Sequence, residues 1–599
     1  MAGAVCRIYG HLNAAVSPHE LRTVAALQRH GGPDGHGGVD GEGFALGGNR
    51  LAVMDLDGGQ QPYTLPGGAV RVVFNGEIYN HRELKARLGG HSFPDDCDGS
   101  VLPALYAEYG DRFTDHLDGM YAVALIDLRA EPRLVLATDP AGMKPLFYRW
   151  DPAAGTLHFS SEIGSLLAFG AVSTDLWTPG LDAYLATKTP FGEQTMFADI
   201  KVLPPGATAV CDRPGGLRIR RREPVQCEAG AAGGLQPALA EQVRRLLTAD
   251  VPVATITSGG LDSSLVTTLA ARTHPGVHTF NIAYRGSWPG DERHFARAAA
   301  AHAGAAYHQV EIDPADFPAM LADVVWHLGQ PNADPITLST FALFREVRAA
   351  GFTVALTGDA ADEVFGGYDR MRDAVADEAA GRPWIPSYVD KLGVLPMARR
   401  HALYTDDYAR EVGAGTGLPE EAERMLHGPG SALSRITAFE LAHRLPAYHL
   451  RRVDHLSMAH SVEARLPFCQ PAILDIGRSL TDDQRVRGGE VKRALYAAAA
   501  GLLPDSVLRR PKQPFTLPVA AMLVPGQPLW EFARDLLTAA ELRSDGQLDP
   551  VAVDALFATQ ADRPGPAAAL ALWALLVHQV WRAQFRAGAR APRGTELAA

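Results

Sequence analysis

The segment VPVATITSGGLDSS, residues 251–264, constrains the fold more than any other stretch of this chain. Its apolar run, residues 251–256, ends abruptly at a Ser-Gly-Gly turn containing Gly259 and Gly260, and helix-compatible sequence follows. This order predicts a buried parallel strand, a tight turn and a helix N-terminus. Two glycines let backbone N–H groups approach an anion, and the helix dipole adds about half a positive charge there. The segment therefore predicts a phosphate-binding turn.

A second acidic turn is expected beside the first. The carboxylate of Asp262 would repel a bare phosphate, so we expect a divalent cation between them, and Mg²⁺ prefers carboxylate and phosphate oxygens. Another apolar run, residues 353–356, also ends in a turn that leads to Asp362. Ligands of α/β sheets bind at the carboxyl ends of the strands. We therefore expect Asp262 and Asp362 to share a Mg²⁺–pyrophosphate unit.

Composition limits the classes of function. A chain of 599 residues is too long for one hydrophobic core. A net charge of −12 and a pI near 6.0 argue against nucleic acid or an anionic membrane as partner. No apolar stretch approaches a membrane span, and the five scattered cysteines lack metal-ligand spacing, as is typical of a reducing compartment. We expect a cytoplasmic protein with small-molecule substrates.

The chain divides into a β-rich first part and an α/β second part. Short strand-like runs between glycine and proline turns predict a layered domain over residues 6–210, with strands at 70–74, 121–127, 134–138 and 157–160. Glycine, proline and arginine in residues 211–235 predict a linker. From 236 to 585, strands alternate with Ala/Leu-rich helical patterns, and 586–599 are expected to be a disordered tail.

The second part resembles the asparagine synthetases and their β-lactam-forming relatives. SGGLDSS is similar to the signature of ATP enzymes that release pyrophosphate, TGDAADEVFGGY is similar to the family's GEGSDEVFGGY, and SMAHSVEARLPF to its SMAHSLEARVPF. The resemblance implies a PP-loop ATP-pyrophosphatase fold, ATP as substrate, and Mg²⁺ held by Asp262 and Asp362. The residues that it assigns to ATP are Thr257, Ser258, Gly259, Gly260, Asp262, Ser263, Ile282, Thr357 and Gly358.

The same resemblance assigns catalytic roles to Asp359 and to Lys512 in RRPKQPF. Asp359 replaces the family's glutamate, and one methylene less moves the carboxylate by up to about 1.5 Å, which indicates an acceptor other than aspartate. Pro514 replaces the usual Gly or Gln after the lysine motif. Three charged residues in and just before the SMAHSVEARLPF segment are expected to form buried ion pairs: Arg452, Asp454 and Glu463.

The first part resembles the glutaminase domain of class II glutamine amidotransferases, an Ntn-hydrolase αββα sandwich. Its most specific motif is FNGEIYNH, residues 74–81. The resemblance implies that Cys6 is the nucleophile, with its own α-amino group as base. It assigns the oxyanion hole to the Asn75 side chain and the Gly76 N–H. It further implies that three charged residues hold the carboxylate and α-ammonium of glutamine: Arg50, Glu77 and Asp98.

Three features depart from that pattern. Residues 1–5 precede Cys6, so we expect their removal to free its amine, whose reference pKa of about 8 suits a base at neutral pH. Arg7 stands where the family has glycine. The sequence at residues 30–34, HGGPD, lacks the arginine of the family's HRGPD. A working glutaminase and a degenerate or specialised one both remain open.

Together these features predict a glutamine-dependent, ATP-consuming amidotransferase. Ammonia released at Cys6 would pass internally to the second domain and capture a carboxylate activated as an acyl-adenylate. The expected acceptor is aspartate or a specialised secondary metabolite. The alternatives are a β-lactam-synthetase-like enzyme that closes an intramolecular amide and has a vestigial first domain, and a non-catalytic ATP-binding homologue. The resemblance is also compatible with a homodimer.

Overall fold

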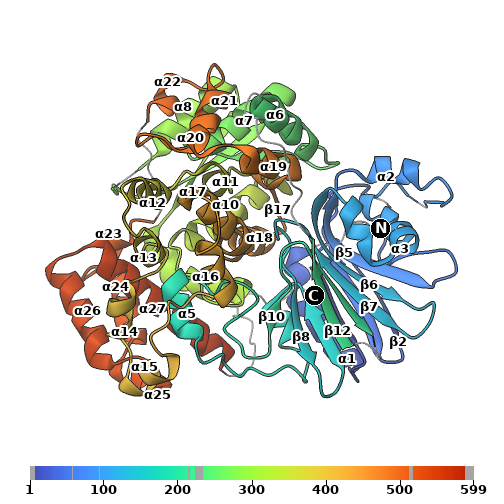
Figure 1. The fold of residues 1–599 in the computed structure, drawn as a ribbon, viewed down its shortest axis with the longest axis horizontal. Coiled ribbons are helices and arrows are strands. Elements are labelled where there is room, and N and C mark those ends of the chain that lie inside the picture. The colour runs from blue at the N-terminus through green and yellow to red at the C-terminus, as the bar shows by residue number, and fades with distance from the viewer. Residues whose placement is uncertain are drawn as a thin grey trace.

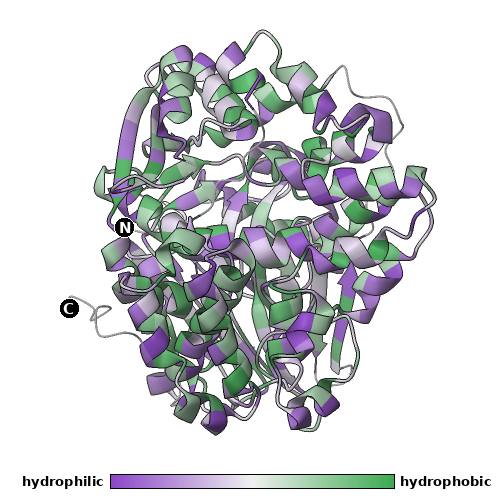
Figure 2. Ribbon diagram, turned by 90° about the vertical axis from the view of Figure 1, so that its left-hand side faces the viewer, coloured by the Kyte–Doolittle hydropathy of each residue, from purple (hydrophilic) through white to green (hydrophobic). Residues whose placement is uncertain are grey.

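The computed structural model describes residues 7–56, 58–93, 95–212, 216–222, 234–289, 291–510 and 517–586. The β-rich first part and the largely helical second part lie side by side (Figure 1). Many surface helices carry both hydrophilic and hydrophobic bands (Figure 2), as helices that cover a core do. Within these ranges, no helix combines the length and apolar character that crossing a bilayer requires.

The first part contains two six-stranded sheets in which every pairing is antiparallel. One sheet has the order β10 (Lys201–Val202), β8 (Phe147–Asp151), β9 (Thr156–Ser160), β1 (Arg7–Leu12), β3 (Phe44–Arg50), β2 (Gly35–Gly41). The other has the order β12 (Gly216–Arg221), β11 (Ala207–Asp212), β7 (Arg133–Thr138), β6 (Gly119–Asp127), β5 (Val70–Ile78), β4 (Tyr63–Thr64). The strands expected at 70–74, 121–127, 134–138 and 157–160 are confirmed within β5, β6, β7 and β9.

The two sheets pack face to face, and helices cover their outer faces. Ile8 and Leu46 of the first sheet share one core with Val73 and Leu136 of the second. Helices α1 (Pro18–Leu27) and α4 (Ile163–Leu166) contact the first sheet, and α2 (His81–Arg87) and α3 (Leu102–Tyr109) share a core with the outer face of the second. The layers are therefore helix, sheet, sheet, helix, because both faces of each sheet are apolar and need cover.

The predicted linker at 211–235 begins too early, before the sheet of the first domain has ended. Cys211 and Asp212 belong to β11, and residues 216–221 form β12, so the first domain's sheet extends past the expected boundary at 210. β12 is an exposed edge strand without a row of buried apolar residues. Its Gly- and Arg-rich sequence therefore resembles that of a loop. Residues 223–233, and the tail from 587 onward, lie outside the described residues.

The second part is built on a five-stranded parallel sheet. Its order is β15 (Ala306–Ile312), β14 (His278–Tyr284), β13 (Val253–Ile256), β16 (Val354–Leu356), β17 (Glu463–Arg465). From β13, the chain adds β14 and β15 on one side, and it then returns to add β16 and β17 on the other side. Ligands of such sheets bind at this switch point, beyond the carboxyl ends of the strands. The predicted strand at 251–256 and its following helix are confirmed as β13 and α7 (Leu261–Thr273).

Helices cover both faces of this sheet. On one face lie α6 (Leu235–Leu246), α7, α8 (Arg293–Ala303), α19 (Pro471–Ser479) and α21 (Arg493–Ala499). On the other lie α9 (Phe317–Leu328), α10 (Ile336–Ala349), α18 (Arg451–Met458) and the long α27 (Pro566–Phe585). Successive residues of β16 alternate between the two faces. Ala355 packs with the core that contains α27, and Val354 and Leu356 pack with the core that contains α7.

Further helices surround this sheet and the helices that cover it (Figure 1). The first group is α11 (Ala361–Phe365), α12 (Asp369–Ala379), α13 (Ile385–Asp390), α14 (Met397–His401), α15 (Asp406–Val412), α16 (Glu420–Leu426), α17 (Ala432–Phe439) and the π-helix η6 (Glu440–Leu450). The others are α5 (Gly180–Thr187), α20 (Asp482–Arg485), α22 (Asp505–Leu508), α23 (Val519–Met522), α24 (Pro528–Leu536), α25 (Ala539–Asp545) and α26 (Pro550–Asp562).

Candidate active sites

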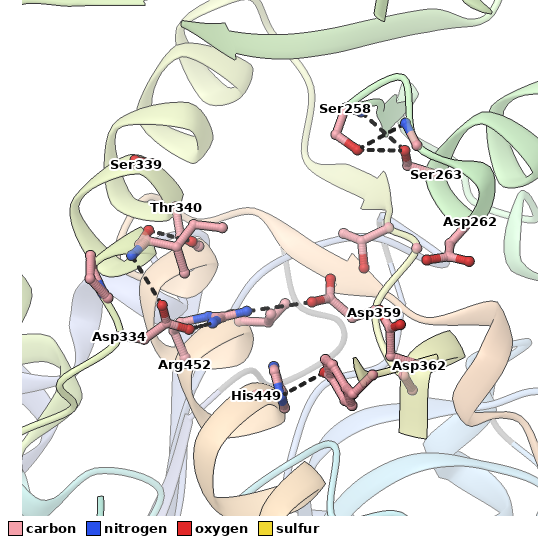
Figure 3. A pocket seen from close by; sticks show the side chains of 18 of the residues that line it. Ser258, Asp262, Ser263, Asp334, Ser339, Thr340, Asp359, Asp362, His449 and Arg452 are labelled. Carbon is pink, nitrogen blue, oxygen red and sulfur yellow. Dashed lines mark hydrogen bonds and ion pairs between the residues drawn. The ribbon is translucent and has the colours of Figure 1, made fainter. Parts of the chain in front are cut away.

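The turn after β13 is fixed by its own serine hydroxyls (Figure 3). The N–H of Ser258 donates to Oγ of Ser263 at 3.0 Å, and the two hydroxyls lie 3.1 Å apart. Gly259 has a φ of 74°, and a Cβ there would lie 2.4 Å from the backbone nitrogen of Ala296. Only glycine fits this position. Helix α7 begins directly after Gly260, so its N-terminal N–H groups open onto the turn.

The turn after β16 lies against the first turn. A Cβ at Gly358 would approach the backbone nitrogen of Ser263 to 2.7 Å. The hydroxyls of Thr257 and Thr357 are buried and have no hydrogen-bond partner among the described residues. Leaving a buried hydroxyl unpaired costs about 1–3 kcal/mol, so both mark places for a polar ligand. The structure thus brings together the two turns that the sequence placed at neighbouring strand ends.

Lys492 connects the two turns, and the sequence analysis missed it. Its ammonium donates to Asp262 at 2.6 Å and lies 2.8 Å from Asp362. Burial disfavours its charge, but the two carboxylates together raise the pKa of Lys492 above its ordinary value. The local sequence shows only a lysine close after Gly488 and Gly489, and its φ of 51° is known from the structure alone. Its acidic partners lie far away in the sequence, so no motif pointed to them.

Asp262 and Asp362 meet the requirements for a Mg²⁺ site only in part. Their carboxylates converge on one point, the ammonium of Lys492. No group of three or more His, Cys, Asp or Glu side chains suited to a metal occurs in the described part of the chain. Mg²⁺ commonly takes one or two carboxylates and completes its shell with water and substrate phosphates. The pair therefore fits a Mg²⁺ that arrives with a phosphate ligand.

Asp359 belongs to a row of charges beside the turns (Figure 3). The guanidinium of Arg452 lies 3.5 Å from the Asp359 carboxylate and also pairs with Asp334. Arg452 is 5% exposed, which confirms the expected buried ion pair. Asp454 and Glu463 are likewise buried in ion pairs.

Glu363 places a further negative charge next to Asp362. It accepts a hydrogen bond from Tyr368 at 2.5 Å and lies 3.0 Å from Nε2 of His449. Burial alone would raise its pKa, but His449 and Arg444 hold the pKa of Glu363 well below its ordinary value. The carboxylate is therefore charged although it is buried.

One cavity of about 900 Å³ contains both turns and this row of charges. Ile282 of β14 lines it, together with Lys188 from the end of the first part. This volume is near the upper end of the roughly 300–1,000 Å³ that is usual for ligand sites. The cavity therefore has room for a nucleotide and a second substrate.

The residues assigned to the oxyanion hole lie on β5. The side chain of Asn75 is fully buried, and neither its oxygen nor its nitrogen has a hydrogen-bond partner among the described residues. Gly76 has a φ of 137°, and a Cβ there would lie 1.9 Å from the carbonyl oxygen of Met120. The backbone conformation thus requires glycine, and an unpaired buried amide is available to a ligand.

The residues assigned to glutamine lie close to this strand. Asp98 accepts the N–H of Ile78 at 2.6 Å, and burial raises the pKa of Asp98 to about 6. Burial, and then the charge of Asp98, raises the pKa of Glu77 well above its ordinary value. Arg50 ends β3 and donates to the carbonyl oxygen of Asp55 at 3.1 Å. Cys6, Lys512 and Pro514 lie outside the described residues.

Arg465 of β17 joins the first domain's site to the second domain. Its guanidinium lies 3.3 Å from Glu77 and donates to Glu463 at 2.8 Å. It also donates to the carbonyl oxygens of Leu246 and Thr248. Arg465 is fully buried, so Glu77 of the first domain and Glu463 of the parallel sheet share one charge cluster.

Arg7 forms a second junction between the domains. Its guanidinium donates to Glu162 at 2.6 Å and to Asp454 of α18 at 3.0 Å, and it is fully buried. Lys144 donates to the other oxygen of Asp454 at 3.0 Å. A Cβ at Gly31 would lie 2.7 Å from Cγ of Arg7. The long side chain at position 7 therefore occupies the space that a side chain at position 31 would need.

Comparison with known proteins agrees with this arrangement. The asparagine synthase family matches residues 234–583, and the glutamine amidotransferase domain family matches residues 5–220. Asparagine synthetase (glutamine-hydrolyzing) 1 of Bacillus subtilis strain 168 is 27% identical over 92% of this chain and 91% of its own. Asparagine synthetase (glutamine-hydrolyzing) 3 of the same strain is 30% identical over 81% and 82%. A putative asparagine synthetase (glutamine-hydrolyzing) of Mycobacterium tuberculosis strain H37Rv is 28% identical over 93% and 92%.

The fold and the two sites define a two-domain glutamine amidotransferase, in which a glutaminase domain precedes a synthetase domain. The chain belongs to the asparagine synthase family.

We expect Arg7→Met to lower the thermal unfolding midpoint, because it leaves Glu162 and Asp454 buried without a shared cation. Loss of one partner of a buried ion pair typically costs about 3–5 kcal/mol. The double variant Arg7→Met/Gly31→Arg should recover part of the loss, since a guanidinium from position 31 enters the same space. Differential scanning calorimetry measures both.

The matched control is Arg112→Met, whose pair with Asp115 lies at the surface, with the arginine side chain 78% exposed. Such pairs contribute about 0–1 kcal/mol, so the midpoint should stay within about a degree or two. A double variant no more stable than Arg7→Met would refute the shared position of the two side chains.

Proposed function

We propose that this protein is a ligase that takes nitrogen from glutamine, activates a carboxylate with ATP and joins the two as an amide. The observation that carries the proposal is the contact of the two strand-end turns in one cavity, with Lys492 between Asp262 and Asp362. The relatives' activity, glutamine-hydrolysing asparagine synthesis, has the same two parts. The helix–sheet–sheet–helix layers support an Ntn-hydrolase first domain, and the parallel sheet supports a PP-loop second domain. We place the enzyme in the cytoplasm.

ATP binds with its phosphates at the two turns and its adenine toward Ile282. The N–H groups of residues 258–260 and the N-terminus of α7 stabilise the phosphate charge. The hydroxyls of Thr257 and Thr357, which have no partner among the described residues, donate to phosphate oxygens. Mg²⁺, when bound, neutralises the pyrophosphate beside Asp262 and Asp362. Lys492 and Lys512 add positive charge there.

The acceptor carboxylate attacks the α-phosphate of ATP. A carbon-bound oxygen forms a new bond to phosphorus, the α–β anhydride bond breaks, and pyrophosphate leaves. Ammonia then attacks the acyl carbon, the new C–N bond replaces the C–O bond, AMP leaves, and the nitrogen loses a proton. Asp359, held by Arg452 at 3.5 Å, is the carboxylate positioned beside this reaction.

The first domain supplies the ammonia. The thiol of Cys6 gives its proton to its own α-amino group and attacks the side-chain amide carbon of glutamine. The C–N bond breaks, the α-amino group returns the proton to the nitrogen, and ammonia leaves. Water then hydrolyses the thioester, which releases glutamate and restores the thiol. Asn75 and the Gly76 N–H stabilise the oxyanion, a contribution worth about 3–4 kcal/mol per donor in comparable sites. Arg50 binds the carboxylate of glutamine, and Glu77 and Asp98 bind its ammonium.

Removal of either turn carboxylate should abolish the synthetase half alone. We expect Asp262→Asn or Asp362→Asn to lower pyrophosphate release at least a hundredfold, because the pyrophosphate loses a metal ligand and Lys492 loses a partner. EDTA should have the same effect on the unaltered enzyme, while glutamine hydrolysis continues. Asp475→Asn, which removes a surface partner of Arg478, is the matched control. Full pyrophosphate release in EDTA would contradict the metal assignment.

The two-site account predicts a clear separation in Cys6→Ala. Glutamine-dependent synthesis should be lost, whereas synthesis from added ammonium should remain at its original rate. Measurements of pyrophosphate and glutamate release in parallel distinguish the two. Unchanged use of glutamine would exclude Cys6 as the nucleophile.

Use of glutamine should fall in acid as Asp98 gains a proton. Because burial raises the pKa of Asp98 to about 6, the carboxylate is charged above that pH and neutral below it. We therefore expect kcat/KM for glutamine to decline as the pH falls through about 6, since the neutral group no longer attracts the substrate ammonium. Asp98→Asn should have a low kcat/KM without this step. A step of the same size in Asp98→Asn would assign the titration to another group.

A β-lactam-synthetase-like reaction with a degenerate first domain is the second candidate. The buried amide of Asn75, which has no hydrogen-bond partner among the described residues, and the glycine-only backbone at Gly76 favour a working glutaminase over it. Aspartate and specialised carboxylates are both acceptors that the proposed chemistry allows.

A further inference from the structure

Amide formation in the synthetase cavity requires a proton acceptor. When ammonia adds to the acyl-adenylate, the new ammonium group must lose a proton before AMP can leave. A cation opposes the protonation of a carboxylate beside it, and four aspartates of the cavity already pair with a lysine or an arginine. These are Asp262, Asp334, Asp359 and Asp362. The reaction therefore needs another base.

His449 is the one histidine among the described residues that line this cavity. It lies near the end of the π-helix η6, and its side chain is 13% exposed. Arg452, which pairs with Asp359, follows three positions later in continuous helical backbone, so the two side chains lie on the same face. Figure 3 shows His449 close to the Arg452–Asp359 pair. An imidazole is the side chain best suited to exchange protons near neutral pH.

One side of the imidazole is held by Glu363. Nε2 of His449 lies 3.0 Å from the charged carboxylate of Glu363. The hydroxyl of Tyr368 donates to the same carboxylate at 2.5 Å, so it does not compete for Nε2. Arg444 also lies 3.0 Å from Nε2, but its guanidinium pairs with Glu440 at 3.3 Å. The carboxylate thus holds the ring proton on Nε2.

The other ring nitrogen, Nδ1, keeps its lone pair. A neutral imidazole carries one proton, so a proton on Nε2 leaves Nδ1 as an acceptor. Among the described residues, none forms a hydrogen bond with Nδ1 of His449. The carboxylate of Glu363 also stabilises the imidazolium that forms once Nδ1 has taken a proton. The pair therefore combines an open acceptor with a counter-charge for the product of proton transfer.

We infer that His449 is the catalytic base of amide formation and that Glu363 is its positioning residue. This rests on the proposed function. Ammonia forms a C–N bond to the acyl carbon of the adenylate, and the carbonyl oxygen becomes an oxyanion. Nδ1 of His449 takes one proton from the new ammonium group. The oxyanion then re-forms the C=O double bond, the C–O bond to AMP breaks, and the amide remains. The imidazolium returns its proton to water.

The test separates adenylation from amide formation. Exchange of labelled pyrophosphate into ATP, with a carboxylate but no nitrogen source, reports adenylation alone, and added ammonium then gives the rate of amide formation. His449→Ala should leave the exchange within about twofold and lower amide formation about a hundredfold to ten-thousandfold, the usual contribution of a general base. Added imidazole should restore part of the loss, because it supplies the missing proton acceptor.

Hydroxylamine makes the test specific for proton removal. Its protonated form is a stronger acid than ammonium, so its adduct loses a proton to water more readily. His449→Ala should therefore lower hydroxamate formation at least about tenfold less than it lowers amide formation. Glu363→Gln should lower amide formation with near-normal exchange, because a neutral amide does not stabilise the imidazolium.

The matched control is His302→Ala. The imidazole of His302 lies 3.0 Å from the carbonyl oxygen of Leu502, outside the cavity, and its loss should change neither rate. Unchanged amide formation in His449→Ala, or equal losses with ammonia and with hydroxylamine, would overturn the inference. Burial lowers the pKa of Lys188, which also lines the cavity, to about 8. Loss of amide formation in Lys188→Met, with His449→Ala unaffected, would assign the base to Lys188 instead.

A labelling experiment tests the same group without a variant. Diethyl pyrocarbonate acylates neutral imidazole nitrogens, and peptide mass spectrometry reads the extent of reaction at each histidine. His449 should react in the unaltered protein, and ATP with Mg²⁺ should protect it, because the nucleotide fills the same cavity. An unreactive His449 in an enzyme that forms the amide would overturn the inference alone. No protection by ATP, together with no exchange from aspartate, glutamate or succinate, would contradict the proposed function itself.

Discussion

Buried ion pairs between the two domains are the interaction on which both sites depend. Arg7 joins the first strand of the glutaminase domain to α18, and Arg465 joins Glu77 to the parallel sheet. A buried charge is costly unless it is paired, so each arginine holds its partners from the opposite domain in one position. Arg7 and Glu77 of the first domain are thereby tied to groups of the synthetase domain.

The ion pairs between the domains are linked to charged residues of both candidate sites. Asp454, which pairs with Arg7, lies on the same helix as Arg452, which pairs with Asp359. Glu463, which pairs with Arg465, begins the edge strand next to β16. A shift of either domain would therefore move charged groups of both candidate sites.

Two departures from the family pattern, Arg7 and the missing arginine of HGGPD, meet in the structure, and Lys188 is a separate feature of the cavity. Gly31 lies against the side chain of Arg7. The arginine that the family has at position 31 and the arginine that this chain has at position 7 would therefore occupy the same space. Lys188, an unusual cation in a left-handed conformation, enters the cavity from the end of α5.

The sequence by itself determined the strand–turn–helix at residues 253–273, the acidic turn after β16 and the layered first domain, because apolar runs and glycine turns act over a few neighbouring residues. It failed at β12, whose exposed edge lacks an apolar pattern, and at Lys492, whose partner Asp262 is 230 positions away. Only the tertiary structure decided that Arg7 fills the space beside Gly31 and that Lys188, within the described residues, forms no ion pair with a carboxylate. Charge pairing is set by proximity in space, and local sequence patterns carry no record of which distant side chains meet.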